Sequence, residues 1–138
     1  GAATTLGADA ARFGLNVPLT LEEQSKRELG QQIAHCGAMP DDALAGLVQI
    51  QRLRDAVLAR ATLRAIRETE GPVVVITGNG HARADYGVPR FLTRQQPGGR
   101  VFTLGQSEAG QLEGTFDAVI DSPAVDRKDP CAVFAGQD

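Results

Sequence analysis

A run of four β-branched apolar residues, Val73 to Ile76, places the strongest constraint on the fold of this chain. Such a run, without alternating polar residues, is typical of a strand whose two faces are both covered, as in a parallel sheet. The next residues, Thr77-Gly78-Asn79-Gly80, end the strand with two glycines, and His81 follows directly. Ligands of open α/β folds bind just beyond the carboxyl ends of the strands. We therefore expect the loop that begins at Thr77 to carry the binding or catalytic residues.

The alternation of helical and strand patterns along the 138 residues indicates one α/β domain. Residues 1–19 are rich in Gly, Ala and Thr and predict an irregular lead-in, residues 20–134 predict the core, and residues 135–138 predict a short tail. We expect a small, mostly parallel sheet packed by a long helix and a shorter one.

Two further apolar runs, 101–104 and 116–120, are strand candidates, and residues 106–113 between them predict a short surface helix. Pro89 and the turn Pro97-Gly98-Gly99 are expected to break the chain before the first of these runs. A sheet of only three strands leaves an edge that invites pairing with another chain. We therefore expect either a homodimer or pairing with strands that lie outside this chain.

A shorter helix is predicted to begin after Thr20, because Thr20 and Glu23 form a capping box. Its apolar stripe consists of Leu21, Ser25, Leu29, Ile33 and Cys36. His35 lies in the last turn, where a cationic imidazole complements the helix dipole. Capping is the simplest interpretation of His35.

A long helix is predicted over roughly residues 43–68, with Asp41 or Asp42 as its N-cap and Gly71-Pro72 as its stop. Most apolar residues of this helix gather on one broad face. Three arginines lie opposite that face and are expected in solvent: Arg52, Arg60 and Arg67.

A polar pair, Gln51 and Asp55, interrupts the apolar face of the long helix, with Arg54 beside it. An unpaired buried carboxylate costs at least several kcal/mol, whereas burying a leucine contributes only about 1.5–3 kcal/mol. Asp55 must therefore be paired, protonated or open to a wet cleft. One interpretation is a structural network with Arg54 or with loop amides. The other is the polar wall of a binding site that faces the loop after Ile76.

His81 is a candidate metal ligand, haem ligand or general acid/base, because its ordinary pKa suits proton transfer near neutral pH. Tyr86 follows five residues later, and a tyrosinate is a known axial ligand of haem iron. The simpler alternatives are a loop histidine that binds the backbone and a tyrosine that packs under the loop. The glycines before His81 fit neither a P-loop nor a dinucleotide fingerprint, and no nucleophile-elbow motif is present.

Charge and cysteine content exclude some classes of protein. A net charge of -3 argues against nucleic-acid binding, and no apolar run is long enough to span a membrane. The first residues lack the features of a signal peptide. Cys36 and Cys131 are either free core thiols or one disulfide formed in an oxidising compartment, and the sequence slightly favours free thiols.

Five short strings occur here in the order seen in the ChaN-like family, whose members are iron-regulated, haem-binding lipoproteins of bacteria. The strings are His35-Cys36-Gly37-Ala38-Met39-Pro40, Gln51-Arg52-Leu53-Arg54-Asp55-Ala56, Gly78-Asn79-Gly80-His81, Asp85-Tyr86-Gly87-Val88-Pro89 and Asp129-Pro130-Cys131. Over roughly residues 29–134 the chain therefore resembles this family, which is related in fold to erythromycin esterases and Tiki metalloproteases. Family members begin with a strand that carries a Gly-Glu-x-His signature, which is absent here. The chain thus resembles the C-terminal half of a larger α/β domain.

The resemblance implies haem as the ligand, held between two protomers, with iron ligated by His81 or Tyr86. It places Gln51, Arg54, Asp55 and His35 in the lining of the same cleft. Arg83 or Arg90 is expected to pair with the haem propionates, because arginine favours bidentate contacts with carboxylates. The family further implies a periplasmic or outer-membrane location, with membrane attachment only through a lipid anchor N-terminal to this chain.

Three functions follow from these observations. The first is a haem-binding module of a bacterial iron-uptake lipoprotein. The second is a metal-dependent hydrolase of the wider superfamily, with a divalent metal ion near His81 and Asp55. The third is a carrier or structural domain whose polar network only holds the long helix and the loop together.

Overall fold

The computed structural model describes residues 6–134 of the chain. The expected tail, residues 135–138, lies outside the described residues, as do the first five residues of the expected lead-in. Within the described part, helices and a two-stranded parallel sheet form a small α/β fold, as the sequence predicts.

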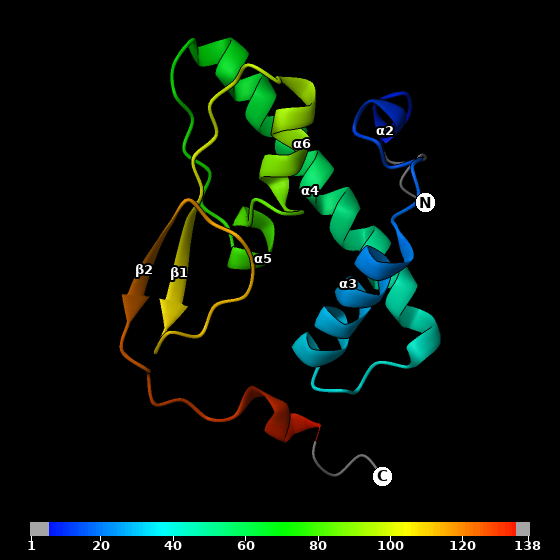
Figure 1. Cartoon of the computed structure of the whole chain (residues 1–138), viewed down its shortest axis with the longest axis vertical. Helices are drawn as coiled ribbons and strands as arrows, with labels where there is room; N and C mark the ends of the chain where they lie inside the picture. Colours follow the sequence, from blue (N-terminus) through cyan, green and yellow to red (C-terminus); the bar gives the residue numbers. More distant parts are fainter. Residues whose placement is uncertain (1–5, 135–138) are drawn as a thin grey trace.

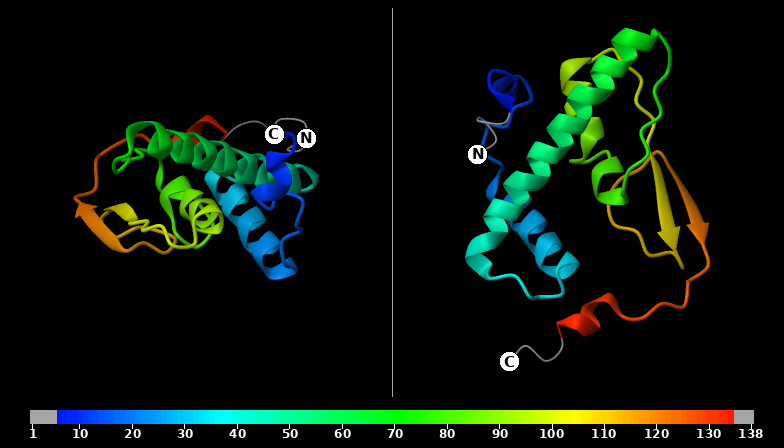
Figure 2. Two further views of the ribbon diagram at one scale, coloured as in Figure 1. Left: turned by 90° about the horizontal axis from the view of Figure 1, so that it is seen from above. Right: turned by 180° about the vertical axis from the view of Figure 1, so that it is seen from behind.

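The longest helix, α4 (Asp41–Thr69), is the element on which the other helices pack. Both α3 (Leu21–Ala34) and α6 (Val88–Gln95) contact it. The short helix α2 (Asp9–Arg12) and the sheet lie on opposite sides of α4 (Figures 1 and 2). None of the helices in residues 6–134 combines the length and the apolar character that crossing a membrane requires.

The hydrophobic core lies between α4, α6 and the N-terminal segment, with the Phe13 and Phe91 rings 6.3 Å apart. Its buried members are Leu6, Ala10, Phe13, Leu15, Ala56, Ala59, Leu63, Val88 and Phe91. The segment expected to be an irregular lead-in therefore contains α2 and contributes directly to the core. Its apolar side chains are too few to attract notice in the sequence, but they cover the apolar face of α4.

Arg52 is buried, and the prediction that it lies in solvent is wrong. Its side chain is only 5% exposed, and Nη2 donates hydrogen bonds to the carbonyl oxygens of Gly14 (3.0 Å) and Val17 (2.9 Å). Because the guanidinium satisfies backbone carbonyls of the N-terminal segment, its burial is tolerated.

Helix α3 begins as predicted, since the Thr20 hydroxyl accepts a hydrogen bond from the backbone N–H of Glu23 at 3.2 Å. Its apolar stripe, however, faces solvent: Leu21 is 88% exposed and Ile33 is 62% exposed. The buried side chain of α3 is instead Arg27. The helix therefore turns a charged group toward the rest of the molecule.

The two strands, β1 (Leu104–Glu108) and β2 (Ala118–Ser122), pair in parallel in the register Leu104 to Ala118. Both lie a few residues later than predicted, and the surface helix expected at 106–113 is wrong because β1 occupies the first part of that range. The sheet contacts the short helix α5 (Asn79–Ala82), whereas α4 packs mainly against helices.

The run from Val73 to Ile76 forms no helix or strand in the described part of the chain, so the prediction of a buried strand is wrong. Val74 is 86% exposed and Ile76 is 93% exposed. A strand requires neighbours, and none of the other described segments pairs with this one. The Asn79 side chain instead binds the backbone of Gln106, at 2.7 Å to its carbonyl oxygen and 3.1 Å to its N–H.

Pro89 does not break the chain as expected but lies in the first turn of α6. At this position the missing N–H of proline costs nothing, and its fixed φ favours the helix. Val88, Pro89 and Phe91 form the buried face of α6. The helix therefore anchors the end of the Tyr86 loop in the core.

Cys36 and Cys131 form a disulfide, so the slight preference for free thiols is wrong. The bond ties the end of α3 to the short helix η1 (Pro130–Val133), whose segment returns beneath α3 (Figure 1). The two Cα atoms lie 5.4 Å apart, within the usual range for a disulfide. The separation of 95 residues between the two cysteines gave no indication that they pair, because only the fold brings them together.

Removing the disulfide should destabilise the chain, because the bond closes a long loop in the unfolded state. Cys36→Ser should lower the free energy of unfolding by about 2–4 kcal/mol in urea denaturation without reductant. The double variant Cys36→Ser, Cys131→Ser should lose no more than the single one, since both lack the same bond. An unchanged denaturation midpoint for Cys36→Ser would show that the bond contributes nothing.

Candidate functional site

The candidate site is centred on a hydrogen bond between α4 and α5. Asp55 Oδ1 lies 2.6 Å from Nδ1 of His81, and the Asp55 side chain is wholly buried. Helix α5 begins at Asn79, directly after the irregular segment 72–78, with Gly78 as its N-cap. The N–H of His81 donates to the Gly78 carbonyl at 2.9 Å. Asp55 therefore faces the loop after Ile76.

Gln51 completes the contact one helical turn earlier. Its side-chain nitrogen lies 3.4 Å from Nε2 of His81, and the His81 side chain is 21% exposed. With Nδ1 donating its proton to Asp55, the lone pair of Nε2 accepts the long hydrogen bond from the Gln51 amide. The two residues of α4 thus contact both ring nitrogens, and a ligand that binds Nε2 would replace the contact with Gln51.

Burial raises the pKa of Asp55 to about 6, although the hydrogen bond from His81 opposes this shift. Its second oxygen, Oδ2, is buried and lacks a hydrogen-bond partner among the described residues. Desolvation disfavours the ionised carboxylate, and the His81 N–H favours it. The Asp55 carboxyl group therefore exchanges its proton with solvent near pH 6.

Gly87 allows the chain to pass close to His81. A Cβ atom at this position would lie 2.3 Å from the His81 carbonyl oxygen and 2.6 Å from that of Arg83. The Gly87 N–H donates to the Arg83 carbonyl at 3.0 Å. No larger residue fits here without moving the backbone of α5. The sequence alone gives no sign of this close approach, because it depends on how the loop folds back onto α5.

Tyr86 lies between arginine side chains. The guanidinium carbons of Arg83 and Arg27 lie 3.8 Å and 4.1 Å from the centre of its ring. Such cation–π contacts hold the ring in place. Burial raises the pKa of the Tyr86 phenol, and the nearby arginines oppose this only in part. The free chain therefore holds Tyr86 as a neutral phenol.

Arg83 is held inside the structure rather than presented to a ligand. It is 6% exposed, and its Nε and Nη2 donate two hydrogen bonds of 2.6 Å to the Asp85 carboxylate. This bidentate pair already uses the geometry that a haem propionate was expected to occupy. Arg90 is half-exposed but donates to Glu23 Oε1 at 2.5 Å.

The remaining predicted site residues lie apart from this pair. Arg54 is exposed on α4. His35 caps α3, with its ring Nδ1 2.8 Å from the Gln31 carbonyl oxygen. No hydrogen bond in the described part of the chain joins either residue to His81. The structure thus brings together Gln51, Asp55 and His81, with Tyr86 and Arg83 in the following loop.

The side chains near His81 limit the kinds of metal centre that this site can hold. Nowhere in residues 6–134 do three His, Cys, Asp or Glu side chains gather closely enough to hold a metal ion. One imidazole with a buried carboxylate behind it fits two roles instead. It can supply a single axial ligand to an iron that a macrocycle already holds, or it can act as a general base.

The raised pKa of Asp55 predicts a pH-dependent stability. The folded chain holds this proton more tightly than the unfolded chain, so the free energy of unfolding should fall as pH rises from about 4 to about 6. A shift of this size corresponds to roughly 3 kcal/mol. Asp55→Asn should remove that part of the fall, measured by urea denaturation across this pH range.

Asp121 provides the matched control for that experiment. Hydrogen bonds from Ser107 and the Gly110 N–H lower the pKa of this exposed carboxyl group. Asp121→Asn should therefore leave the fall between pH 4 and 6 in place. If Asp55→Asn and the unsubstituted chain gave parallel curves, the raised pKa of Asp55 would be disproved.

Comparison with known families confirms the resemblance found in the sequence. Residues 1–92 match the family described as haem-binding uptake, Tiki superfamily, ChaN, and this range includes Gln51, Asp55, His81 and Tyr86. Comparisons with curated proteins and with solved structures gave no match. On the family match, the chain belongs to the ChaN family of the Tiki superfamily, a family of haem-binding uptake proteins.

Proposed function

We propose that this chain is the haem-binding module of a bacterial iron-uptake lipoprotein, with haem as its cargo. The proposal includes a periplasmic or outer-membrane location and a lipid anchor N-terminal to this chain. The family match supports the haem-binding part. The Cys36–Cys131 disulfide supports the location, because disulfides persist in oxidising compartments such as the periplasm.

The hydrogen bond between Asp55 and His81 is the observation that carries this proposal. Histidines that ligate metals commonly donate their other ring N–H to a carboxylate, which fixes the ring and makes the ligating nitrogen more basic. Here Asp55 Oδ1 accepts that bond at 2.6 Å, and Nε2, whose other contact is the Gln51 amide at 3.4 Å, is the nitrogen that would bind iron. We therefore favour His81 over Tyr86 as the residue that would hold the haem iron. A bound haem would supply the iron centre, and this chain would supply the imidazole.

Tyr86 takes second place because its phenol is neutral in the free chain. Ligation of ferric iron by tyrosine requires the phenolate, and burial raises the pKa of Tyr86. Its ring is also in contact with Arg27 and Arg83. We expect Tyr86 to support the haem site through packing.

A second surface would complete the haem site. Ligand pockets usually bury most of their ligand, and the His81 side chain is 21% exposed at the surface of this chain. The unpaired segment that contains Val74 and Ile76 directly precedes this loop and exposes both side chains. Pairing through that segment, with a second copy or with an N-terminal half of the protein, would cover the haem from the other side.

A metal-dependent hydrolase is the second candidate, because a buried carboxylate that orients a histidine is also the arrangement of a general base. Its metal ion would need further ligands beyond His81 and Asp55, and no third one gathers with them in residues 6–134. Metal-stimulated esterase or peptidase activity of the intact protein, lost in His81→Ala, would favour this candidate over haem uptake.

Titration with haemin tests the proposed ligand. His81→Ala should weaken binding at least about tenfold and change the Soret band, because it removes the axial nitrogen. Tyr86→Phe keeps the ring and should change binding much less. His35→Ala is the matched control, because His35 is the other histidine of the chain and caps α3.

The reverse pattern, with loss of the Soret change in Tyr86→Phe alone, would assign iron to Tyr86 and reject His81. Binding that neither variant weakens would reject both ligands. Sedimentation during the same titration measures association, and haemin-bound chains that stay monomeric would contradict a haem shared between two copies.

A further inference from the structure

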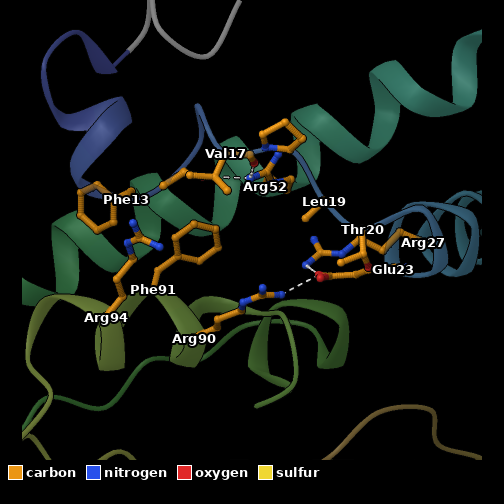
Figure 3. Close-up of a pocket in the computed structure, with 12 residues that line it drawn as sticks. Phe13, Val17, Leu19, Thr20, Glu23, Arg27, Arg52, Arg90, Phe91 and Arg94 are labelled. Atoms are coloured by element: carbon orange, nitrogen blue, oxygen red, sulfur yellow. Dashed lines mark hydrogen bonds and ion pairs between the residues drawn. The ribbon is translucent and has the colours of Figure 1, made fainter.

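A pocket of about 130 Å³ lies between the start of α3, the middle of α4 and α6, apart from the Asp55–His81 pair (Figure 3). Four of its lining side chains are arginines: Arg27, Arg52, Arg90 and Arg94. Its volume is well below the roughly 300–1,000 Å³ of pockets that enclose drug-sized molecules. We call it the arginine pocket, and its size suits a small ion or a single charged group.

Arg27 is the residue that makes this pocket a binding site rather than a surface depression. Its side chain is 5% exposed, and its Nε and Nη1 are buried without a hydrogen-bond partner among the described residues. Its one side-chain hydrogen bond in the described part of the chain is from Nη2 to Glu23, and its guanidinium carbon lies 4.1 Å from the centre of the Tyr86 ring. Buried guanidinium donors are normally satisfied, so two open donors on one buried arginine indicate a missing acceptor.

The side chains that line the pocket carry an excess of positive charge. Glu23 is the single acidic residue that lines it, and its carboxylate binds both Arg27 and Arg90, as the dashed lines in Figure 3 show. Burial alone would raise the pKa of Glu23, but its hydrogen bonds with Arg90 and Arg27 outweigh burial and lower it. One carboxylate therefore faces four guanidinium groups.

Arg52 experiences the same excess of positive charge. Burial lowers its pKa, and the positive charges of Arg27 and Arg90 lower it further, with only Glu23 acting in the opposite direction. Arg52 nevertheless donates to the carbonyls of Gly14 and Val17, which fixes its place at the wall of the pocket. An added negative charge would relieve the repulsion among these cations.

We propose that the arginine pocket binds a small oxyanion, either phosphate or the carboxylate of a small organic molecule. The open Nε and Nη1 of Arg27 would donate to the oxygen atoms of the anion, in the manner that guanidinium groups recognise carboxylate and phosphate. Arg90, which is half-exposed at the entrance, would close over it. The proposal does not involve haem and stands apart from the function proposed above.

Glu23 acts in this account as a competitor within the chain. Its carboxylate already occupies one donor of Arg27 and one of Arg90. A bound oxyanion would share these arginines with Glu23 and would be repelled by its charge. Removing that charge should therefore strengthen anion binding, whereas a purely structural role for Glu23 predicts only a loss of stability.

Isothermal titration of the whole chain with sodium phosphate, and separately with sodium acetate, tests the proposal at constant ionic strength set with sodium chloride. Saturable binding of at least one anion is expected. Arg90→Gln should weaken it about tenfold or more, because a charged donor is lost. Glu23→Gln should strengthen binding about fivefold, because it removes a competing negative charge. The control is Arg64→Gln, which changes an exposed arginine that pairs with Glu68 on α4 and should leave the affinity unchanged.

Arg27→Gln should abolish binding, and its denaturation curve shows whether it still folds. If it does not fold, Arg90→Gln and Glu23→Gln carry the test, because both residues lie nearer the surface. Binding of phosphate alone assigns the pocket to phosphate groups, and binding of acetate alone assigns it to carboxylates. The proposal would be overturned if neither phosphate nor acetate showed saturable binding. It would also be overturned if Arg90→Gln, Glu23→Gln and Arg64→Gln all bound the anion with equal affinity.

Discussion

Asp55 is wholly buried on the long helix, where an uncompensated carboxylate would cost several kcal/mol, and the imidazole of His81 is what makes its position tolerable. This one hydrogen bond fixes α5 against α4. Fixing α5 in turn fixes the loop that carries Tyr86, since Gly87 allows the loop to pass within contact of the His81 backbone. The orientation of the His81 imidazole thus depends on a carboxylate that the core would otherwise exclude.

The same constraint links stability to function. A carboxylate at Asp55 raises the basicity of Nε2 and holds the imidazole ring in place, which favours ligand binding. Its burial lowers the free energy of unfolding, and this loss grows as the carboxylate ionises. An asparagine would avoid that cost but would lose the negative charge behind the imidazole. This balance between stability and ligand binding is the one that the proposed role of Asp55 requires.

The sequence predicted features that depend on neighbouring residues. The long helix and the Thr20 cap follow from periodicity and capping chemistry. The cost of burying a charge led to two interpretations of Asp55, and the structure agrees with the one in which Asp55 faces the loop after Ile76. Features that depend on distant partners were missed. A strand at 73–76 needs pairing that residues 6–134 do not provide, and the Cys36–Cys131 bond depends on where the C-terminal segment returns. Burial of Arg52 was missed because the carbonyl groups of Gly14 and Val17 that it binds lie outside its helix. Burial of Arg27 was missed because the Tyr86 ring on which it packs lies in a distant loop.

The tautomer of His81 is the most direct test of this account. Nitrogen-15 NMR of the imidazole rings, with His35→Ala to assign the signals, reports which ring nitrogen carries the proton at neutral pH. The bond to Asp55 predicts a protonated Nδ1 and an unprotonated Nε2 in the free chain. A proton on Nε2 with Nδ1 bare would contradict the account, because the nitrogen proposed to receive a ligand would then be blocked.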